Sequence, residues 1–343
     1  MSLRFIKKRQ RWKPLWFWVI VLPLFLGTFF FLSGRVGIFS SPEKEIEISE
    51  DLVHVKVWEK ETGKLLEIGL EAYILGVVAA EMPASFPLEA LKAQAVAART
   101  YAVQHLQVPD PRVKALHPEA NLSSDPAVNQ AWISTAEMKK RWGKWHYAAH
   151  REKIRQAVEE TKGQVLLYKG QLIDPVYHAS CGGKRTENSG EVWKFDVPYL
   201  RGVPCTGHQD RHHSTALFFT LKTCDALLDT NLTALPASKF RQDQKVFQIK
   251  EKSVTGRVKV MTIGGKAFSG TELRTHLNLP STRFTCEKGK NGLNFISNGY
   301  GHGVGMCQYG AADLAAAGKD YKEILRHYYT GVQMGQIKKT ETG

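Results

Sequence analysis

The chain has 343 residues, of which 43% are hydrophobic and 23% charged. This is the composition of an ordinary globular protein, and it excludes a disordered chain. Half of the net charge of +14 lies in residues 1–40, which contain seven Lys and Arg and no acidic residue. The remaining +7 is spread over a long sequence, whereas nucleic-acid-binding proteins usually concentrate their positive charge. The sequence therefore gives no support for a nucleic-acid partner.

Residues 1–14 form a basic tail in front of an apolar segment. The stretch 15–32 has 18 uncharged residues, near the lower limit for a transmembrane helix. Six basic residues precede it and Arg35 follows closely, so the positive-inside rule places the N-terminus in the cytoplasm. We therefore predict an uncleaved transmembrane signal-anchor over 15–34. The alternative is a cleaved signal peptide, but it would have a shorter apolar region and a small-residue cleavage site.

The first half of the exported part changes its periodicity twice. In chain order the sequence predicts a linker, a β-hairpin, two helices and a long loop, over residues 35–50, 53–68, 71–82, 87–106 and 107–130. Alternating apolar residues around a turn at 61–64 indicate the hairpin. Apolar residues at a spacing of three to four indicate the helices, the second with Pro87 in its first turn. Its small Ala90, Ala93 and Ala97 allow another backbone to approach.

Strands dominate the second half. After a helix around 153–161, the patterns predict strands at 164–168, 172–178, 247–250, 258–263 and 295–296 and a final helix at 321–329. Helices and strands segregate rather than alternate, which is typical of an α+β fold with an antiparallel sheet. We expect one extracytoplasmic catalytic domain over 51–335 and a short C-terminal tail over 336–343.

Glu81 is the first candidate for chemistry. It ends a helix among the apolar residues Val77, Val78 and Met82, and Pro83 stops the helix beside it. A carboxyl group in such surroundings is desolvated, which raises its pKa and suits it to act as a general acid. The alternative is a glutamate at a solvated helix end. Glu89, at the start of the next helix, complements the helix dipole.

Residues 298–311 form the second candidate. Five glycines lie among a histidine, a glutamine and two tyrosines, which favours a loop that approaches a ligand closely. The alternative is a glycine-rich turn within a sheet. The residues expected to bind substrate here are His302, Gly303, Gly305, Gln308 and Tyr309.

The third candidate is residues 177–193, followed by the segment around Tyr199. We expect a ligand-lining loop with Tyr177, Ser180, Glu187, Asn188 and Tyr199. The His178/Cys181 pair by itself is a weak indication of a metal or a nucleophilic cysteine, because no second ligand pair accompanies it. The five cysteines are too few for a disulfide scaffold, and a Cys181–Cys205 bridge is left open.

These motifs together resemble the stage II sporulation protein D family over about residues 45–335. They read AEMP at 80–83, AARTYA at 97–102, HASCGGKRTENS at 178–189 and GHGVGMCQYGA at 301–311. The resemblance implies a membrane-anchored lytic transglycosylase of endospore formers. Such an enzyme cleaves the MurNAc–GlcNAc bond of peptidoglycan glycan strands during engulfment, from the mother-cell membrane facing the septal space. It also implies two partners, the amidase/endopeptidase stage II sporulation protein P and the membrane protein stage II sporulation protein M.

The family's catalytic glutamate corresponds to Glu81, the glutamate of AEMP. One carboxylate is sufficient for a lytic transglycosylase, because the C6 hydroxyl of MurNAc is the nucleophile and closes a 1,6-anhydro ring. His302, Gln308 and Tyr309 would orient sugar hydroxyls or the N-acetyl group, and Tyr177 and Tyr199 would stack on sugars. The alternative is a non-catalytic peptidoglycan-binding scaffold that positions a partner amidase.

Some family members carry a zinc pattern, H-x5-C-x4-H-C, after the long helix. The matching positions here are His117, Ser123, Val128 and Asn129, so one ligand of four is present. A tetrahedral zinc site needs four ligands, or three and water. We therefore predict no metal and no other cofactor, and no effect of chelation.

Overall fold

A computed structural model describes the chain over residues 44–48, 54–193, 195–205, 207–208, 210–236, 240 and 246–339. The chain divides into two compact units, Met1–Pro42 and Glu43–Gly343, and all described residues lie in the second. The transmembrane segment predicted at 15–34 lies outside the described residues. Within them, no helix is both long and apolar enough to cross a membrane.

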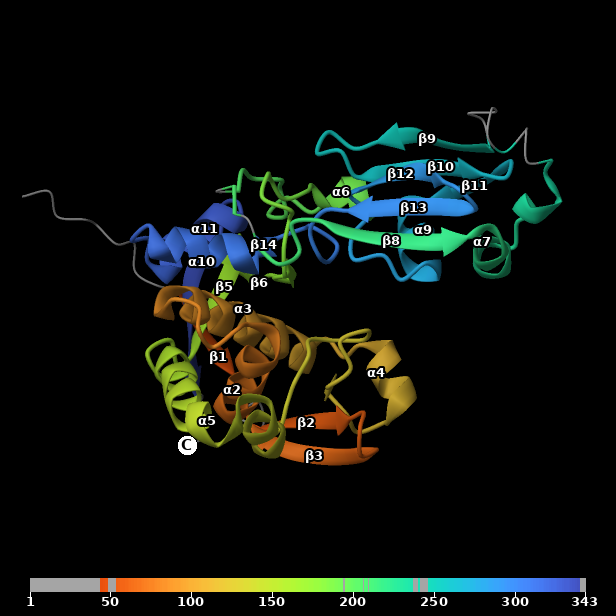
Figure 1. The fold of residues 1–343 in the computed structure, drawn as a ribbon. Helices are drawn as coiled ribbons and strands as arrows, with labels where there is room; N and C mark the ends of the chain where they lie inside the picture. The colour runs from red at the N-terminus through yellow and green to blue at the C-terminus, as the bar shows by residue number, and fades with distance from the viewer. Residues whose placement is uncertain are drawn as a thin grey trace, which may run out of the picture. The chain divides into compact units, whose positions relative to one another are not determined.

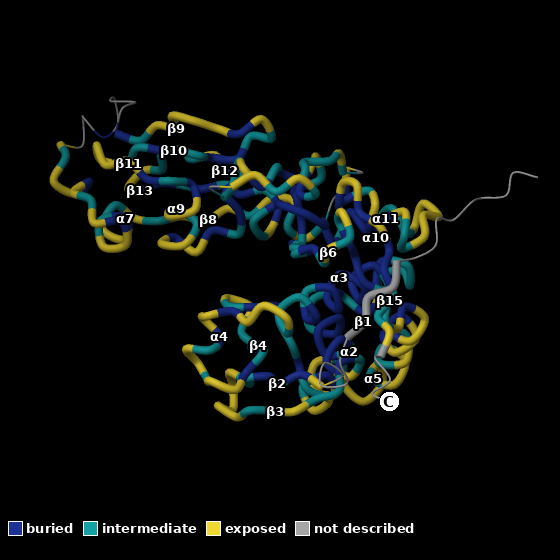
Figure 2. Tube along the Cα trace, turned by 180° about the vertical axis from the view of Figure 1, so that it is seen from behind, coloured by how far each residue is buried: buried dark blue, intermediate teal, exposed yellow. Residues whose placement is uncertain are grey.

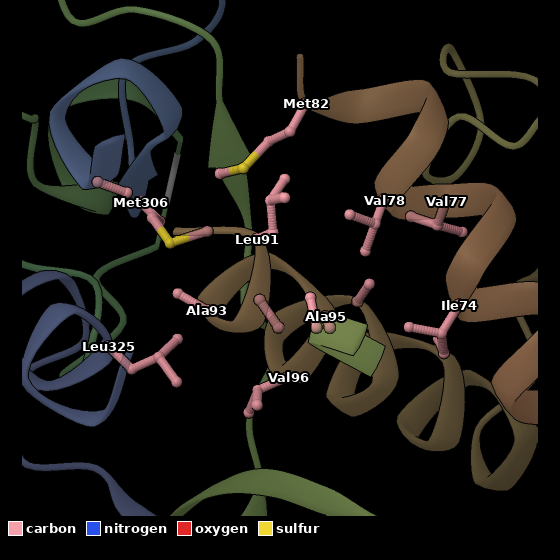
Figure 3. Packing of buried hydrophobic residues seen from close by; sticks show 14 of the residues in the cluster. Ile74, Val77, Val78, Met82, Leu91, Ala93, Ala95, Val96, Met306 and Leu325 are labelled. Atoms are coloured by element: carbon pink, nitrogen blue, oxygen red, sulfur yellow. The ribbon is translucent and has the colours of Figure 1, made fainter. Parts of the chain in front are cut away.

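A central helix organises the first core. This helix, α3 (Leu88–Gln107), contacts α2 (Leu70–Glu81), α5 (Thr135–Glu159), α10 (Gln308–Ala316), α11 (Tyr321–Tyr328) and strand β5 (Gln164–Tyr168) (Figure 1). Its Ala90, Ala93 and Ala97 are fully buried, which confirms that small residues let neighbours approach. Figure 3 shows side chains of α2 on one side of α3, and Met306 and Leu325 on the other.

Local signals set where the helices begin and end. Helix α2 ends at Glu81 because Met82 precedes a proline and takes an extended conformation, with φ −117° and ψ 144°. Pro87 is the N-cap residue of α3 rather than its first helical residue. Helix α5 begins far upstream of the predicted 153, at a capping box formed by Ser134 and Glu137. A non-helical Gly143 interrupts it, which explains why its early turns lack a clear period.

The predicted hairpin is present as β2 (His54–Glu59) and β3 (Lys64–Gly69). The predicted loop 107–130 contains two further elements, α4 (Pro111–Leu116) and β4 (Leu122–Ser123). Strand β4 pairs in parallel with β2 and so fixes this segment to the hairpin.

The linker and tail boundaries need correction. Residues placed in the linker form β1 (Lys44–Ile48), and residues placed in the tail belong to β15 (Gln333–Lys339). These two strands pair in parallel, and β15 also pairs with β5, whose other neighbour is β6 (Gln171–Leu172). Pairing across the whole domain leaves no trace in local periodicity, so the sequence did not indicate it.

Residues 215–297 build a second core of two antiparallel sheets with short helices. The elements are β8 (Thr215–Thr220), α7 (Leu221–Leu228), η2 (Leu232–Ala234), β9 (Phe247–Lys252), β10 (Val258–Ile263), β11 (Lys266–Ser269), α9 (Gly270–His276), β12 (Phe284–Gly289) and β13 (Gly292–Ser297). The sheet orders are β12-β13-β8 and β11-β10-β9. Buried Phe284 and Phe295 lie in the core, and the edge strand β9 is largely exposed (Figure 2).

The α+β class is confirmed, but the sheets are not all antiparallel. Besides the two parallel pairs above, β7 (Tyr177–His178) pairs in parallel with β14 (Met306–Cys307). The segment predicted as one strand at 172–178 is therefore divided between β6 and β7. Among the described residues of the following loop, α6 (Ser189–Val192) is the one helix or strand. The β7–β14 pair places the HASC motif beside the glycine-rich motif.

Candidate active site

Glu81 lies at the C-terminal end of α2, half-buried. Its Oε1 accepts a hydrogen bond from the backbone N–H of Ala131 at 2.8 Å, and the amide of Gln308 approaches its Oε2 at 3.5 Å. Burial raises the pKa of the Glu81 carboxyl, and this outweighs the charge of Arg141 and the hydrogen bonds from Ala131, Gln308 and Tyr177, all of which lower it. The direction predicted from the apolar neighbours is confirmed.

A close approach between two segments delivers the Ala131 N–H. The loop after residue 130 packs directly on α2 at Gly76, where a Cβ atom would lie only 2.2 Å from Nε1 of Trp132. The N–H of Ile133 donates to the Gly76 carbonyl at 3.4 Å. Only a residue without a side chain leaves room for this packing, so Gly76 supports the hydrogen bond to Glu81.

Amide side chains surround the carboxylate. Gln308 Nε2 donates to Gln94 Oε1 at 3.3 Å, and both residues are buried. Tyr177 donates from its hydroxyl to Gln130 Oε1 at 3.0 Å, and Gln130 Nε2 donates to the Tyr73 hydroxyl at 3.2 Å. The structure thus brings two of the residues expected to bind substrate, Gln308 and Tyr177, to Glu81. It adds Gln94, Gln130 and Ala131, which the sequence analysis missed because each lies in a stretch without a motif.

Gln94 has unused hydrogen-bonding capacity. Its Nε2 is buried and has no hydrogen-bond partner among the described residues. Tyr309, which follows Gln308, is half-buried with its ring 5.0 Å from that of Phe86 in an edge arrangement. The amide hydrogens of Gln94 that have no partner among the described residues are therefore available to a ligand near Glu81.

His302 is used internally rather than aimed at Glu81. Its Nε2 donates to the Tyr177 carbonyl at 2.9 Å, and its Nδ1 accepts from the Val304 N–H at 3.1 Å. Burial lowers the pKa of His302 to about 3, so the ring is neutral. With both nitrogens engaged, His302 ties the glycine-rich loop to β7.

Two glycines of this loop are required by protein packing. Gly303 and Gly305 have φ of +86° and +70°. A Cβ atom would lie 2.2 Å from Nη2 of Arg257 at Gly303 and 2.0 Å from the Val176 carbonyl oxygen at Gly305. The close approach expected of this loop is therefore made to other parts of the chain.

The residues expected at the third motif hold loops together. Ser180 donates to Asp210 Oδ2 at 2.7 Å. Buried Glu187 accepts from Ser253 Oγ at 2.6 Å and from the Thr255 hydroxyl. None of these contacts involves Glu81.

Asn188 and Tyr199 have comparable roles. Asn188 Oδ1 accepts from the Gly202 N–H at 2.9 Å. The Tyr199 hydroxyl accepts from the Asp174 N–H at 3.0 Å, and its ring lies 5.6 Å from that of Tyr168. Their hydrogen bonds join the segment after α6 to the N-cap of α6 and to the loop after β6.

The prediction of no metal was based on the loop at 117–129 and on the absence of a second ligand pair beside His178 and Cys181. In that loop His117 stacks on Trp58, with ring centroids 5.3 Å apart. Elsewhere in the described part, four side chains from three segments converge: Cys181, Cys205, His208 and Cys307. The open Cys181–Cys205 bridge is absent, since both are free thiols. The His178/Cys181 pair had drawn attention to Cys181, and the Cys205-x2-His208 spacing was a second signal that could have pointed to this group.

The fold and the site define a helix-and-sheet protein with the desolvated carboxylate of Glu81 held among amides. The family model described as "Stage II sporulation protein" matches residues 59–168. The chain belongs to the stage II sporulation protein D family, and it is thereby a sporulation-related cell-wall protein.

Individual relatives cover most of the chain. It is 35% identical to stage II sporulation protein D of Bacillus subtilis over 83% of this chain and 79% of that protein. It is 34% identical to stage II sporulation protein D of Bacillus amyloliquefaciens, over 85% and 81%. A third relative, the amidase enhancer of Bacillus subtilis, is 31% identical over 76% of this chain and 40% of that protein.

Proposed function

We propose that this protein is a lytic transglycosylase that cleaves the MurNAc–GlcNAc bond of peptidoglycan glycan strands, with Glu81 as the single acid and base. The observation that carries the proposal is the half-buried Glu81 carboxyl with its raised pKa, contacted by amide groups. A retaining hydrolase would need a second carboxylate at about 5–5.5 Å as nucleophile. An intramolecular nucleophile from the substrate removes that need.

The chemistry balances with one protein group. Protonated Glu81 donates its proton to the GlcNAc O4 as the C1–O4 bond breaks. The C6 hydroxyl of MurNAc then attacks C1, forms the 1,6-anhydro bond and returns its proton to Glu81. The same group acts as acid and then as base, which is most efficient when its pKa is near ambient pH. The Ala131 N–H stabilises the carboxylate between the two steps, and Gln308 and Gln94 offer amides to a sugar substituent.

The products of glycan digestion test this proposal. We expect purified glycan strands treated with the protein to yield chains that end in 1,6-anhydroMurNAc, detected by mass spectrometry. Reducing MurNAc ends would show a hydrolase instead. No cleavage at all would favour the scaffold function.

The scaffold function is the second candidate, and one comparison favours it. A relative named amidase enhancer shares 31% identity with this chain. A protein of this class would bind glycan strands and position a partner amidase without cutting the strands. For the partners we propose stage II sporulation proteins P and M, on the basis of the family resemblance.

We also propose that residues 15–34 anchor the protein in the membrane with the catalytic domain outside. The basic tail and the apolar stretch support this topology. A reporter fused after Gly343 should be external, and the C-terminal part should be digested by protease added to intact, unengulfed cells. Protection of the C-terminus would contradict this topology.

A further inference from the structure

Four soft ligand atoms meet in the group of Cys181, Cys205, His208 and Cys307, all within 4.8 Å of one another. Nε2 of His208 lies 3.5 Å from Sγ of Cys181 and 3.3 Å from Sγ of Cys307. In a tetrahedral zinc site, ligand distances of about 2.3 Å for sulfur and 2.0–2.1 Å for nitrogen place neighbouring ligand atoms about 3.6 Å apart. The two nitrogen–sulfur distances match this separation, and the remaining pairs of ligand atoms lie within 4.8 Å.

The histidine is oriented as zinc-binding histidines are. Its Nδ1 pairs with Asp210 Oδ2 at 2.7 Å, and both side chains are almost fully buried. Asp210 is itself held by the Ser180 hydroxyl at 2.7 Å and the His212 N–H at 2.6 Å. This carboxylate–histidine pair keeps the proton on Nδ1 and aims the free electron pair of Nε2 at the sulfurs, as in many zinc sites.

The sulfurs also have the surroundings of thiolates. The backbone N–H of Cys181 donates to Cys307 Sγ at 3.3 Å, and the N–H of Gly310 approaches the same sulfur at 3.5 Å. The Tyr328 hydroxyl lies 3.3 Å from Cys205 Sγ. Hydrogen bonds to sulfur stabilise its charged form, which is the form that binds metal.

We propose that Cys181, Cys205, His208 and Cys307 bind one Zn²⁺ ion as a structural site. Three thiolates and one imidazole in tetrahedral arrangement select zinc among the common divalent ions. Four protein ligands complete the coordination shell, so the ion stabilises the fold and does not activate water. This site lies outside the loop pattern at His117, and the proposal replaces the prediction of no metal and no effect of chelation.

The position of the site explains what the ion would stabilise. Its ligands come from the loop after β7, the loop at 205–208 and strand β14, which are distant in sequence. Cys307 is also the N-cap of α10, and the next residue is Gln308, the neighbour of Glu81. The zinc ion would therefore hold the segment that carries Gln308 against the HASC loop.

Metal analysis of the full-length chain, purified without chelator and with a phosphine reductant, tests the proposal. We expect one zinc per chain by mass spectrometry of the elements. Cys181→Ser and Cys307→Ser should lose it, whereas the control Cys286→Ser, in the second core, should keep it. Cobalt added to the zinc-depleted wild-type chain should give the visible spectrum of a tetrahedral thiolate site.

One variant tests the site with all four ligands in place. Asp210→Asn should weaken zinc binding by about 10–100-fold in competition with a chelator. The proposal is overturned if the wild-type chain binds neither added zinc nor cobalt, or if Cys181→Ser and Cys307→Ser retain as much zinc as Cys286→Ser. None of these measurements depends on glycan cleavage, so they can fail independently of the proposed activity.

Discussion

Glu81→Gln should lower the rate of glycan cleavage by ~10²–10⁴, and toward the upper end because one group serves both steps. Glutamine keeps the size of the side chain, and its oxygen can still accept from the Ala131 N–H. It cannot donate or take up the reaction proton. The rate is measured on purified glycan strands by release of 1,6-anhydroMurNAc ends.

The matched control is Glu89→Gln, the same change in the next helix. Glu89 pairs with Lys92 at 2.6 Å and accepts from the Tyr321 N–H, which a glutamine oxygen can still do. Glu89→Gln should retain near wild-type activity and lose about 0.5 kcal/mol of stability. Near wild-type cleavage by Glu81→Gln would exclude the proposed mechanism.

Because the pKa of Glu81 is raised, the wild type and Glu81→Gln should differ in how their activity and stability depend on pH. Cleavage by the wild type should fall as the pH rises through the pKa of Glu81, because the acid form is lost. The stability of the fold should change in the same range. Below pH 4.5, the ordinary pKa of a glutamate, the carboxyl is protonated and burying it costs nothing extra; above the raised pKa it is charged in the folded protein, and its burial lowers the free energy of unfolding by the full amount. Glu81→Gln should therefore match wild-type stability in acid and equal or exceed it at neutral pH, in urea unfolding.

Arg99→Met should destabilise the domain by about 3–5 kcal/mol. Arg99 is fully buried in α3, and its guanidinium donates to both carboxylate oxygens of Glu71, at 2.9 and 2.6 Å. It also donates to the carbonyls of Gln164 and Val158, at 3.2 and 3.3 Å. Methionine fills part of the space but takes the cation away from the partly buried Glu71 carboxylate, which keeps only the Gly163 N–H as a donor among the described residues.

Urea unfolding of Arg99→Met and of a surface counterpart measures this effect. The counterpart is Arg155→Ala, which breaks the exposed pair of Arg155 with Glu152 and should cost no more than about 1 kcal/mol. Equal losses of unfolding free energy in the two variants would show that the hydrogen bonds from Arg99 in α3 to Glu71 in α2 and Gln164 in β5 do not stabilise the fold.

Local sequence patterns were sufficient to predict many of the helices and strands of this protein. The hairpin, α2, α3, β5, β10 and α11 follow from alternation, from three-to-four spacing and from prolines at helix ends, because these signals act between near neighbours in the chain. The same local signals made Glu81 a candidate, and its assignment as the catalytic residue came from the family resemblance. The family resemblance likewise depended on short motifs in order.

Only the tertiary structure showed which residues distant in the chain contact one another. The pairing of β1 with β15 joins the two ends of the domain, and the β7–β14 pair brings Gln308 to Glu81. Ala131 reaches the carboxylate because Gly76 lets a distant loop pack on α2. The Cys181, Cys205, His208 and Cys307 group arises in the same manner. Contacts between residues far apart in the chain depend on packing of the whole fold, and no local periodicity records them.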